Sequence, residues 1–562
     1  MPDYRPIPIG VEDFKRIIDN KYYFVDKTMM IKDLIDSGAS VTLFTRPRRF
    51  GKTLNMSMIQ RFFEKTEENN SYLFDGLDIS GAGEKYMGKM GQYPVISLSL
   101  KSMKQPTFED ALFEYRTLII REFERHRKAV MSVDLTADER NQYETICNRT
   151  AVNMVYVTAL RLLSDCLKKA YRTNVIILID EYDVPLENAY FNGFYDEMIA
   201  LIRSAFESAL KTNNSLEFAV LTGCLRISKE SIFTGLNNLN VYPVTDNSMS
   251  QYFGFTEQDV KKVTDFYNLS DEFDIIKEWY DGYLFGETEI YNPWSVLKYI
   301  QYALSNKNHP PKAYWINTSS NDIIHKLIRN SDRKIRDDIE KLINDESIDK
   351  PLYEDITYVN MNVKSDYIWS FLLHTGYLKP IKIYQIYDET YFKACTPNRE
   401  VRMIYKSTFK NWFNESIREA DKSVLFNAVL NGDARTFEIE INRWLSKSIS
   451  YHDGYENFYH GFLVGLLEYS DDYEVLSNRE NGTGRSDIVI KDIITYRKAV
   501  IIEIKSVRKK DGETLEGQCA EALKQIEDRQ YEVNLKNEGY TDIVKYGIAF
   551  QEKKCSVVKS DK

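Results

Sequence analysis

The amino-acid sequence predicts a mixed α/β protein with several domains, and three observations support that fold class. The chain has 562 residues, which is enough for roughly three to four domains of ordinary size. Apolar residues make up 43% and charged residues 28% of it, a balance that allows several buried cores. In the first half, short apolar runs alternate with segments of helical period, which is typical of a mostly parallel sheet with helices on its faces.

The first 250 residues are expected to form one α/β domain built on that alternation. Its expected strands are residues 41–46, 94–100, 175–180 and 217–222, and its expected long helices are residues 108–129 and 153–171. Residues 251–450 lose the strand rhythm and favour helices, apart from a β-hairpin over residues 377–397 that turns near Asp388. This middle region is therefore predicted to be a helical domain carrying a small hairpin.

The last part of the chain returns to alternating strands and helices. Helices are expected over residues 456–469 and 514–531, and strands over residues 473–476, 486–491, 499–505 and 546–550. This pattern predicts a compact second α/β domain. The sequence therefore divides into three expected domains at residues 1–250, 251–450 and 451–562.

Composition and charge argue against several other classes of protein. The sequence has no run of about 18 uncharged apolar residues, and its N-terminus carries Asp3, Glu12 and Asp13 where a signal peptide needs an apolar run. We therefore expect a cytoplasmic protein with no membrane partner. The six cysteines form no C-x-x-C pair and the six histidines are dispersed, which favours neither a disulfide framework nor a zinc site. A net charge of -10 means that any contact with nucleic acid must be local.

A phosphate-binding loop is predicted directly after the first expected strand. Phosphate binding in such a loop needs backbone N–H groups, a helix N-terminus, a lysine for the β and γ phosphates and a hydroxyl for magnesium. The residues expected to bind the nucleotide here are Arg48, Arg49, Gly51, Lys52, Thr53 and Leu54. The match to G-x-x-x-x-G-K-[ST] is partial, because Arg46 stands where the first glycine belongs. By average residue usage, G-K-[ST] occurs by chance in about a quarter of chains of this length, so a second signal is needed.

That second signal is the apolar strand expected over residues 175–180, which ends in Asp180 and Glu181. A strand of this kind delivers a carboxylate to the magnesium ion of a nucleotide, and the next acidic residue orients or deprotonates the attacking water. The following strand ends in Thr222, with Arg226 close behind it, where a group that senses the γ phosphate is expected. Together these features predict an ATP site that uses Mg2+.

Several arginines are candidates for stabilising the charge that develops on the phosphates. They are Arg48, Arg203 and Arg226, acting either within one chain or across a subunit interface. No spacing argument chooses among them.

A second group of charged residues is predicted in the last domain. Asp487 begins one expected strand, and Glu503 and Lys505 lie on the same face of the next, because side chains alternate along a strand. Two carboxylates and an amine at one place can bind magnesium, activate a water molecule and stabilise negative charge on a phosphate. Phosphodiester hydrolysis is the reaction that this set indicates. Helices containing Glu456 and Gln525 flank the site, and a basic cluster at residues 508–510 follows it.

Short motifs along the whole chain resemble two known families. The bacterial AAA-ATPase-like family is resembled by residues 23–28 (YFVDKT), 46–53 (RPRRFGKT), 179–185 (IDEYDVP), 221–238 (LTGCLRISKESIFTGLNN), 279–283 (WYDGY) and 397–401 (PNREV). The PD-(D/E)XK nuclease superfamily is resembled by residues 459–461 (YHG), 478–480 (NRE), 484–487 (GRSD) and 503–505 (EIK).

This resemblance implies a fold and a set of roles. It implies an AAA-like P-loop NTPase domain, a middle helical, winged-helix-like lid that includes the hairpin, and a C-terminal restriction-endonuclease-like α/β domain. Asp487, Glu503 and Lys505 would form the nuclease triad, Gln525 would match an accessory helix position, and Glu456 would be an extra carboxylate for the metal. In the ATPase family Arg46 is the usual form of the loop, and a related archaeal group uses a similar one.

The leading hypothesis is an ATP-regulated nucleic-acid enzyme that cleaves DNA or RNA with Mg2+ and serves in genome or anti-phage defence. The alternative is a nucleotide-dependent switch, or a nucleic-acid-binding module, whose nuclease domain is inactive. A third reading is a scaffold in which both sites have degenerated. The sequence leaves open DNA against RNA, and a homo-oligomer is compatible with it.

Overall fold

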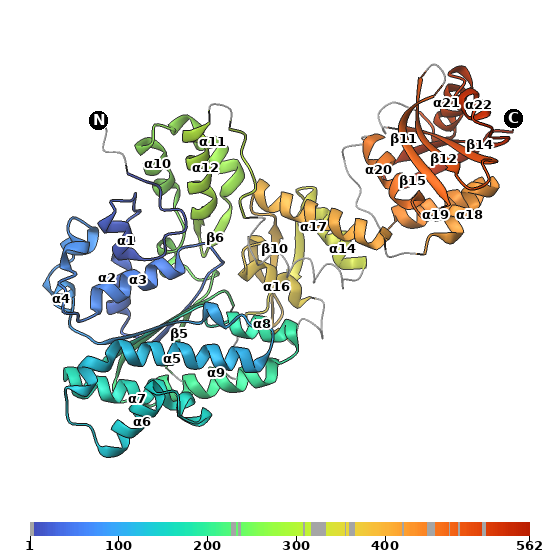
Figure 1. The fold of residues 1–562 in the computed structure, drawn as a ribbon. Coiled ribbons are helices and arrows are strands. Elements are labelled where there is room, and N and C mark those ends of the chain that lie inside the picture. Colours follow the sequence, from blue (N-terminus) through green and yellow to red (C-terminus); the bar gives the residue numbers. More distant parts are fainter. Residues whose placement is uncertain are drawn as a thin grey trace. The chain divides into compact units, whose positions relative to one another are not determined.

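The computed structural model describes residues 5–225, 232–233, 238–306, 309–315, 333–354, 356–358, 366–418, 421–446, 456–470, 472–481, 484–507 and 513–561. The chain divides into two compact units (Figure 1). Unit 1 consists of Met1–Thr318 and Ser347–Ile404, and unit 2 of Ser319–Glu346 and Tyr405–Lys562. This division into units is based on compactness and does not test the three domains expected from the sequence. Their boundaries therefore remain a prediction.

Unit 1 is built on a parallel sheet, as the sequence predicts. Its strands are β1 (Val41–Thr45), β2 (Val95–Ser99), β3 (Val175–Asp180), β4 (Leu216–Gly223) and β5 (Leu239–Tyr242). They lie in the order β2-β3-β4-β1-β5, and every pair is parallel. The four expected strands all form, whereas β5 was not expected. Because β4 lies between β1 and β3, the carboxyl ends of these three strands are neighbours at one edge of the sheet.

Helices cover both faces of this sheet. They are α1 (Phe14–Asp19), α2 (Met29–Ser37), α3 (Lys52–Phe63), α4 (Glu84–Met87), α5 (Phe108–Met131), α6 (Ala137–Cys147), α7 (Asn153–Tyr171), α8 (Val184–Asn192) and α9 (Tyr195–Leu210). Figure 1 shows α5, α7 and α9 on one side of the strands and α1, α2 and α3 on the other. The expected helix over residues 153–171 has the bounds of α7, and that over 108–129 extends slightly to give α5.

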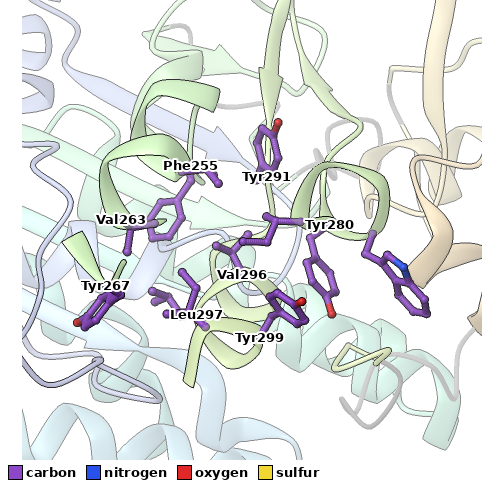
Figure 2. Close-up of a cluster of buried hydrophobic side chains, with 12 residues drawn as sticks. Phe255, Val263, Tyr267, Tyr280, Tyr291, Val296, Leu297 and Tyr299 are labelled. Carbon is purple, nitrogen blue, oxygen red and sulfur yellow. The ribbon is translucent and has the colours of Figure 1, made fainter. Parts of the chain in front are cut away.

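A small helical layer follows the sheet within unit 1. It contains α10 (Glu257–Phe266), α11 (Phe273–Tyr280), α12 (Pro293–Ser305) and the hairpin of β6 (Tyr283–Phe285) and β7 (Thr288–Ile290). The Asn292 side chain caps α12 by accepting the backbone N–H groups of Trp294 and Ser295. Figure 2 shows the aromatic core that holds these elements, with Phe255, Val263, Tyr267, Tyr280, Tyr291, Val296, Leu297 and Tyr299 packed together.

The expected hairpin of the middle region is also present in unit 1. Its strands are β9 (Lys379–Ile386) and β10 (Glu389–Cys395), joined by a turn at Tyr387 and Asp388. A third strand, β8 (Ile348–Pro351), pairs with β10, and α16 (Tyr367–His374) precedes β9. The next helix, α17 (Arg399–Arg418), belongs to both units, because the division between them falls after Ile404.

Unit 2 is built on a mixed sheet, which confirms the second α/β domain. Its strands are β11 (Tyr473–Asn481), β12 (Gly484–Asp492), β13 (Lys498–Ser506), β14 (Asp542–Gln551) and β15 (Lys554–Lys559), in that spatial order. Its helices are α14 (Arg333–Ile343), α18 (Ser423–Asn431), α19 (Ala434–Leu445), α20 (Glu456–Leu467), α21 (Leu515–Asp528) and α22 (Glu532–Asn537). Only β13 and β14 run parallel among these neighbouring strands, and α21 and α22 lie between them in the chain.

Two close approaches explain how the helices of unit 2 sit on its sheet. A Cβ atom at Gly547 would lie 2.3 Å from the carbonyl oxygen of Cys519, so α21 lies directly against β14. On the edge strand β15, the Asn442 side chain of α19 accepts the N–H of Cys555 at 2.9 Å and donates to its carbonyl oxygen at 3.0 Å. Among the described residues, no helix is both long and apolar enough to cross a membrane.

Candidate active sites

The first site lies where β1, β3 and β4 of unit 1 end together. The Thr53 hydroxyl donates to Oδ2 of Asp180 at 2.7 Å, and the Thr222 hydroxyl donates to Oδ1 of the same carboxylate. Residues that are far apart in the sequence therefore meet on one buried carboxylate. Burial and the nearby charge of Glu181 raise the pKa of Asp180, while the two hydroxyl bonds oppose that shift.

Lys52 lies beside this carboxylate at the start of α3, with a side chain only 3% exposed. Its Nζ donates to the carbonyl oxygens of Arg46 at 3.0 Å and Pro47 at 3.1 Å, and it lies 3.8 Å from Oε1 of Glu181. Burial lowers the pKa of the ammonium, but the acidic groups around it, with Cys224 and Glu181 foremost, outweigh burial and raise it. The lysine is therefore charged and held by backbone carbonyls.

The loop before α3 presents free backbone donors. Gly51 caps the helix with φ 84°, and Arg49 also has a positive φ of 73°. Across residues 51–54, which the structure describes in full, no backbone N–H donates to a protein acceptor. A curled loop of unpaired N–H groups at a helix N-terminus is an anion site. With Lys52, Thr53 and Asp180, it fits the phosphates and magnesium ion of a nucleotide.

The two loop arginines already have partners in the protein. Nη2 of Arg48 donates to both carboxylate oxygens of Glu187 on α8, at 2.8 and 2.7 Å. The guanidinium of Arg49 lies 4.2 Å from the ring centre of Trp294. Arg226, which the sequence analysis also expected near the phosphates, lies outside the described residues. Glu187 was missed by the sequence analysis, although it lies one helical turn beyond the D-E-Y-D segment.

Asp183 is a second residue that the sequence analysis missed. Its carboxylate accepts the backbone N–H groups of Cys224 at 2.7 Å and Leu225 at 3.1 Å, which ties the end of β3 to the loop after β4. Burial, with help from the charge of Glu181, raises the pKa of Asp183 to about 6. Gly223 has to be glycine here, because a Cβ atom would lie 2.5 Å from the Tyr182 ring.

Glu181, expected to orient or deprotonate the attacking water, follows directly after β3. Its backbone has a positive φ of 57°, a conformation that costs free energy for a residue with a side chain. The strained turn places Oε1 of its carboxylate at the Lys52 ammonium. Backbone strain of this kind is typical of functional sites, where the surrounding structure maintains the strained conformation.

The second site lies on the sheet of unit 2. β12 and β13 pair from Ile488 with Ile502, and just before this point Oδ2 of Asp487 accepts the N–H of Ile504 at 2.8 Å. Asp487 therefore continues the ladder with its side chain, and its carboxylate lies over β13. Burial raises the pKa of Asp487 above its usual value, against the opposing effect of that backbone bond.

Gln525 on α21 joins the other two residues of this site. Its amide oxygen accepts the Lys505 ammonium at 2.6 Å, and its amide nitrogen donates to Oε1 of Glu503. Nζ of Lys505 lies 3.9 Å from Oε1 of Glu503, and both side chains lie on one face of β13, as their spacing predicts. The structure thus brings together Asp487, Glu503, Lys505 and Gln525.

Two further side chains at this site were not expected. Nε2 of His460 on α20 lies 2.8 Å from the carbonyl oxygen of Asp487, and the buried Tyr531 hydroxyl lies 3.4 Å from the amide nitrogen of Gln525. Glu456 begins α20, but its side chain lies outside the described residues, as does the basic cluster at residues 508–510.

The donor set of each site suits magnesium. In the described part of the chain, no three His, Cys, Asp or Glu side chains gather as a metal cluster. Magnesium is commonly held by one or two carboxylates, with waters and substrate phosphates as its other ligands. Asp180 with Thr53 in unit 1, and Asp487 with Glu503 in unit 2, match that requirement.

The unit 1 site has the arrangement of a phosphate-binding loop beside a buried carboxylate, and the unit 2 site has a donor set that fits a divalent metal ion. Residues 8–233 match the AAA-ATPase-like family model, described as a predicted AAA-ATPase, and residues 454–560 match the PD-(D/E)XK nuclease superfamily. The similarity to each family is thus limited to one part of the chain, an AAA-ATPase-like part near the N-terminus and a PD-(D/E)XK nuclease-like part near the C-terminus.

The chain is also similar to a curated protein, "Uncharacterized protein in vnfD 5'region", from Azotobacter chroococcum mcd 1. The two are 26% identical over 332 residues, which cover 58% of this chain and 56% of that protein. The chain thus spans a little over half the length of this relative.

Proposed function

We propose that the protein is an ATP-regulated, magnesium-dependent nuclease that acts in defence against phage or mobile DNA. The observation that carries this proposal is the convergence of charged side chains in each of the two sites, around Lys52 and Asp180 in unit 1 and around Glu503 and Lys505 in unit 2. A domain kept only for its shape would not need a buried lysine beside acidic residues, because buried charges cost stability unless they are paired.

The ATPase half of the proposal assigns a task to each residue of the unit 1 site. Magnesium, when bound, neutralises charge on the phosphate oxygens. Thr53 and Asp180 would hold the ion, because the Thr53 hydroxyl oxygen and Oδ2 of Asp180 already lie 2.7 Å apart. Lys52 would exchange its carbonyl partners for phosphate oxygens. Glu181 would orient the attacking water and accept its proton.

The nuclease half uses the side chains on β12 and β13. Asp487 and Glu503 would hold magnesium, which supplies an activated water when bound. Lys505 would stabilise the negative charge that grows on the phosphate. Gln525 would fix the directions of Glu503 and Lys505 through its two hydrogen bonds.

Contacts inside unit 1 support regulation by ATP. The ring of Phe50 in the nucleotide loop packs on Tyr283 at 4.9 Å and Phe285 at 5.3 Å. A Cβ atom at Gly376 would lie 3.0 Å from side-chain atoms of Pro47 in the same loop and 3.3 Å from the Tyr283 ring. A change in the conformation of this loop would therefore alter the packing of the β6–β7 hairpin and of the turn before β9.

The first turn of α17 is held by other residues of unit 1. Glu400 on that turn is 0% exposed and accepts the Ser295 hydroxyl at 2.8 Å and the backbone N–H of Trp315 at 2.8 Å. Asn398 caps the helix and donates to the carbonyl oxygen of Asp281 at 2.6 Å. Because α17 is shared by both units, it is the element through which we expect nucleotide state to reach the nuclease.

The test is cleavage of labelled DNA and RNA by the full chain, with Mg2+ and with or without ATP. Wild type is compared with Lys52→Ala and with Glu503→Gln, which removes a charge while keeping the side-chain shape. The proposal expects cleavage that ATP modulates, that Glu503→Gln abolishes and that Lys52→Ala makes insensitive to ATP. Clear ATP turnover without cleavage of any substrate would instead support a nucleotide-dependent switch whose unit 2 only binds nucleic acid.

A further inference from the structure

Arg46 is a buried guanidinium at the start of the nucleotide loop, where the common form of such a loop has glycine. Its side chain is 0% exposed. Nη1 donates to the carbonyl oxygens of Thr45 at 2.9 Å and Tyr242 at 2.6 Å. Its Nε and Nη2 atoms make no hydrogen bond to any described residue. A buried charge with so few polar partners is costly and calls for an explanation.

Two aromatic rings also lie against this guanidinium. Its central carbon lies 5.3 Å from the ring centre of Phe253 and 5.1 Å from that of Phe285. Interaction of a cation with the faces of aromatic rings is strongest where water is excluded. Burial lowers the pKa of Arg46 to about 9, so the group still carries its charge at neutral pH. We call this arrangement of Tyr242, Phe253 and Phe285 the arginine slot.

The backbone of Arg46 connects the arginine slot to Lys52. Its N–H donates to the carbonyl oxygen of Gly223 at 2.9 Å, and its own carbonyl oxygen accepts the Lys52 ammonium at 3.0 Å. The carbonyl oxygen of Pro47 accepts the same ammonium at 3.1 Å. One residue therefore has its side chain fixed in the slot and its carbonyl group on the lysine.

We propose that Arg46 is a positioning residue for nucleotide binding, whose guanidinium anchors the loop entrance in the arginine slot so that the carbonyl groups of Arg46 and Pro47 direct Lys52. The inference rests on the ATP binding proposed above for the same loop. Glycine at this position would restore the common motif but would lack the anchor and leave the slot empty. In this chain, the substitution that improves the motif should weaken the site.

The experiment compares Arg46→Gly, Arg46→Met and Arg46→Lys with wild type in the full chain. Methionine fills the slot without a charge, whereas lysine keeps the charge and one donor for Tyr242. We measure the Kd for ATP and the kcat and KM of ATP hydrolysis, together with Tm. We expect Arg46→Gly and Arg46→Met to raise Kd and KM about tenfold, which is about 1.4 kcal/mol of binding free energy. Arg46→Lys should recover part of that loss.

A matched control separates positioning from general instability. Phe123 packs on Tyr143 at 4.7 Å in the α5–α6 region and takes no part in either site. Phe123→Ala should lower Tm at least as much as Arg46→Met and leave the Kd for ATP unchanged. If Arg46→Gly does not fold, Arg46→Met and Arg46→Lys decide the question.

Different failures have different meanings. Wild-type affinity in Arg46→Met, or equal or better affinity in Arg46→Gly, would overturn the inference and leave the ATPase proposal intact. An equal rise of Kd in Phe123→Ala would also overturn it, because the effect would then follow stability alone. A wild-type protein that binds no ATP, and behaves like Lys52→Ala, would overturn the proposed function and this inference together.

Discussion

The two sites hold their lysines in opposite ways. Lys52 in unit 1 is bound by backbone carbonyl groups of a loop, whereas Lys505 in unit 2 is bound by the side chain of Gln525. The first lysine must give up its partners to reach a phosphate. The second is aligned in advance by side chains on a strand and a helix. We therefore expect the exchangeable backbone contacts of Lys52 to serve the proposed regulation and the side-chain contacts of Lys505 to serve the proposed cleavage.

The largest expected effect comes from breaking the unit 1 arrangement. Lys52→Ala should lower kcat/KM for ATP at least about a hundredfold, because a buried charge on the phosphates is worth several kcal/mol in the transition state. Glu503→Gln should leave ATP turnover within about twofold of wild type in the same phosphate-release assay. Equal losses in both variants would show that the two sites do not work as separate units.

The fixed arrangement of unit 2 is tested at Gln525. Gln525→Ala removes the bridge between Glu503 and Lys505 and should lower the rate of cleavage by about ten- to a hundredfold, as losses of supporting hydrogen bonds at metal sites do. The measurement is single-turnover cleavage of labelled nucleic acid with saturating Mg2+. Tyr531→Phe, which removes only the longer contact, is the milder companion variant. A wild-type rate in Gln525→Ala would contradict the idea that this lysine is aligned in advance.

Glu400, on the first turn of α17, allows a test through the pH dependence of stability. Burial raises its pKa from an ordinary value of 4.5 to about 7. The folded protein therefore binds this proton more tightly than the unfolded chain does, so the native state loses stability as pH rises from about 4.5 to about 7. Glu400→Gln lacks this loss, and its stability relative to wild type should increase by on the order of 2 kcal/mol between about pH 5 and pH 8. Urea unfolding at both pH values measures it, and parallel curves for the two proteins would contradict the assignment.

The smallest effect is expected at Thr222. Thr222→Val removes the hydroxyl that donates to Asp180 and keeps the shape of the side chain. Asp180 retains the Thr53 hydroxyl, so kcat for ATP hydrolysis should fall only about three- to tenfold. Steady-state kinetics at several Mg2+ concentrations would show whether the loss is in metal affinity. A loss as large as that of Lys52→Ala would place Thr222 in direct contact with the nucleotide.

Much of the unit 1 site could be predicted from the order of its motifs along the chain. Parallel strands bring their carboxyl ends to one edge, so an expected strand before Gly51 and another before Asp180 already imply that Thr53 meets Asp180. The same reasoning placed Glu503 and Lys505 on one face of a strand. These parts follow from local periodicity and a small number of topological rules.

The remaining parts depend on tertiary contacts that leave no local pattern. The arginine slot uses rings from segments about 200 residues away along the chain, and the sequence around Arg46 does not indicate them. Glu187 and Asp183 look like ordinary acidic residues of a helix start until their partners are known. The strands β5 and β15 are short and carry polar residues, so their hydrophobic periodicity is weak.

The contact between α19 and β15 has a consequence for anyone who wishes to express the second domain alone. The side chains of Asn442 and Glu438 satisfy backbone groups of Cys555 and Val557 on an edge strand that would otherwise face solvent. A fragment starting at residue 454, where the superfamily match begins, would leave these groups bare, and uncovered strand edges promote aggregation. A soluble fragment should therefore begin before α18, so that its own chain protects the edge.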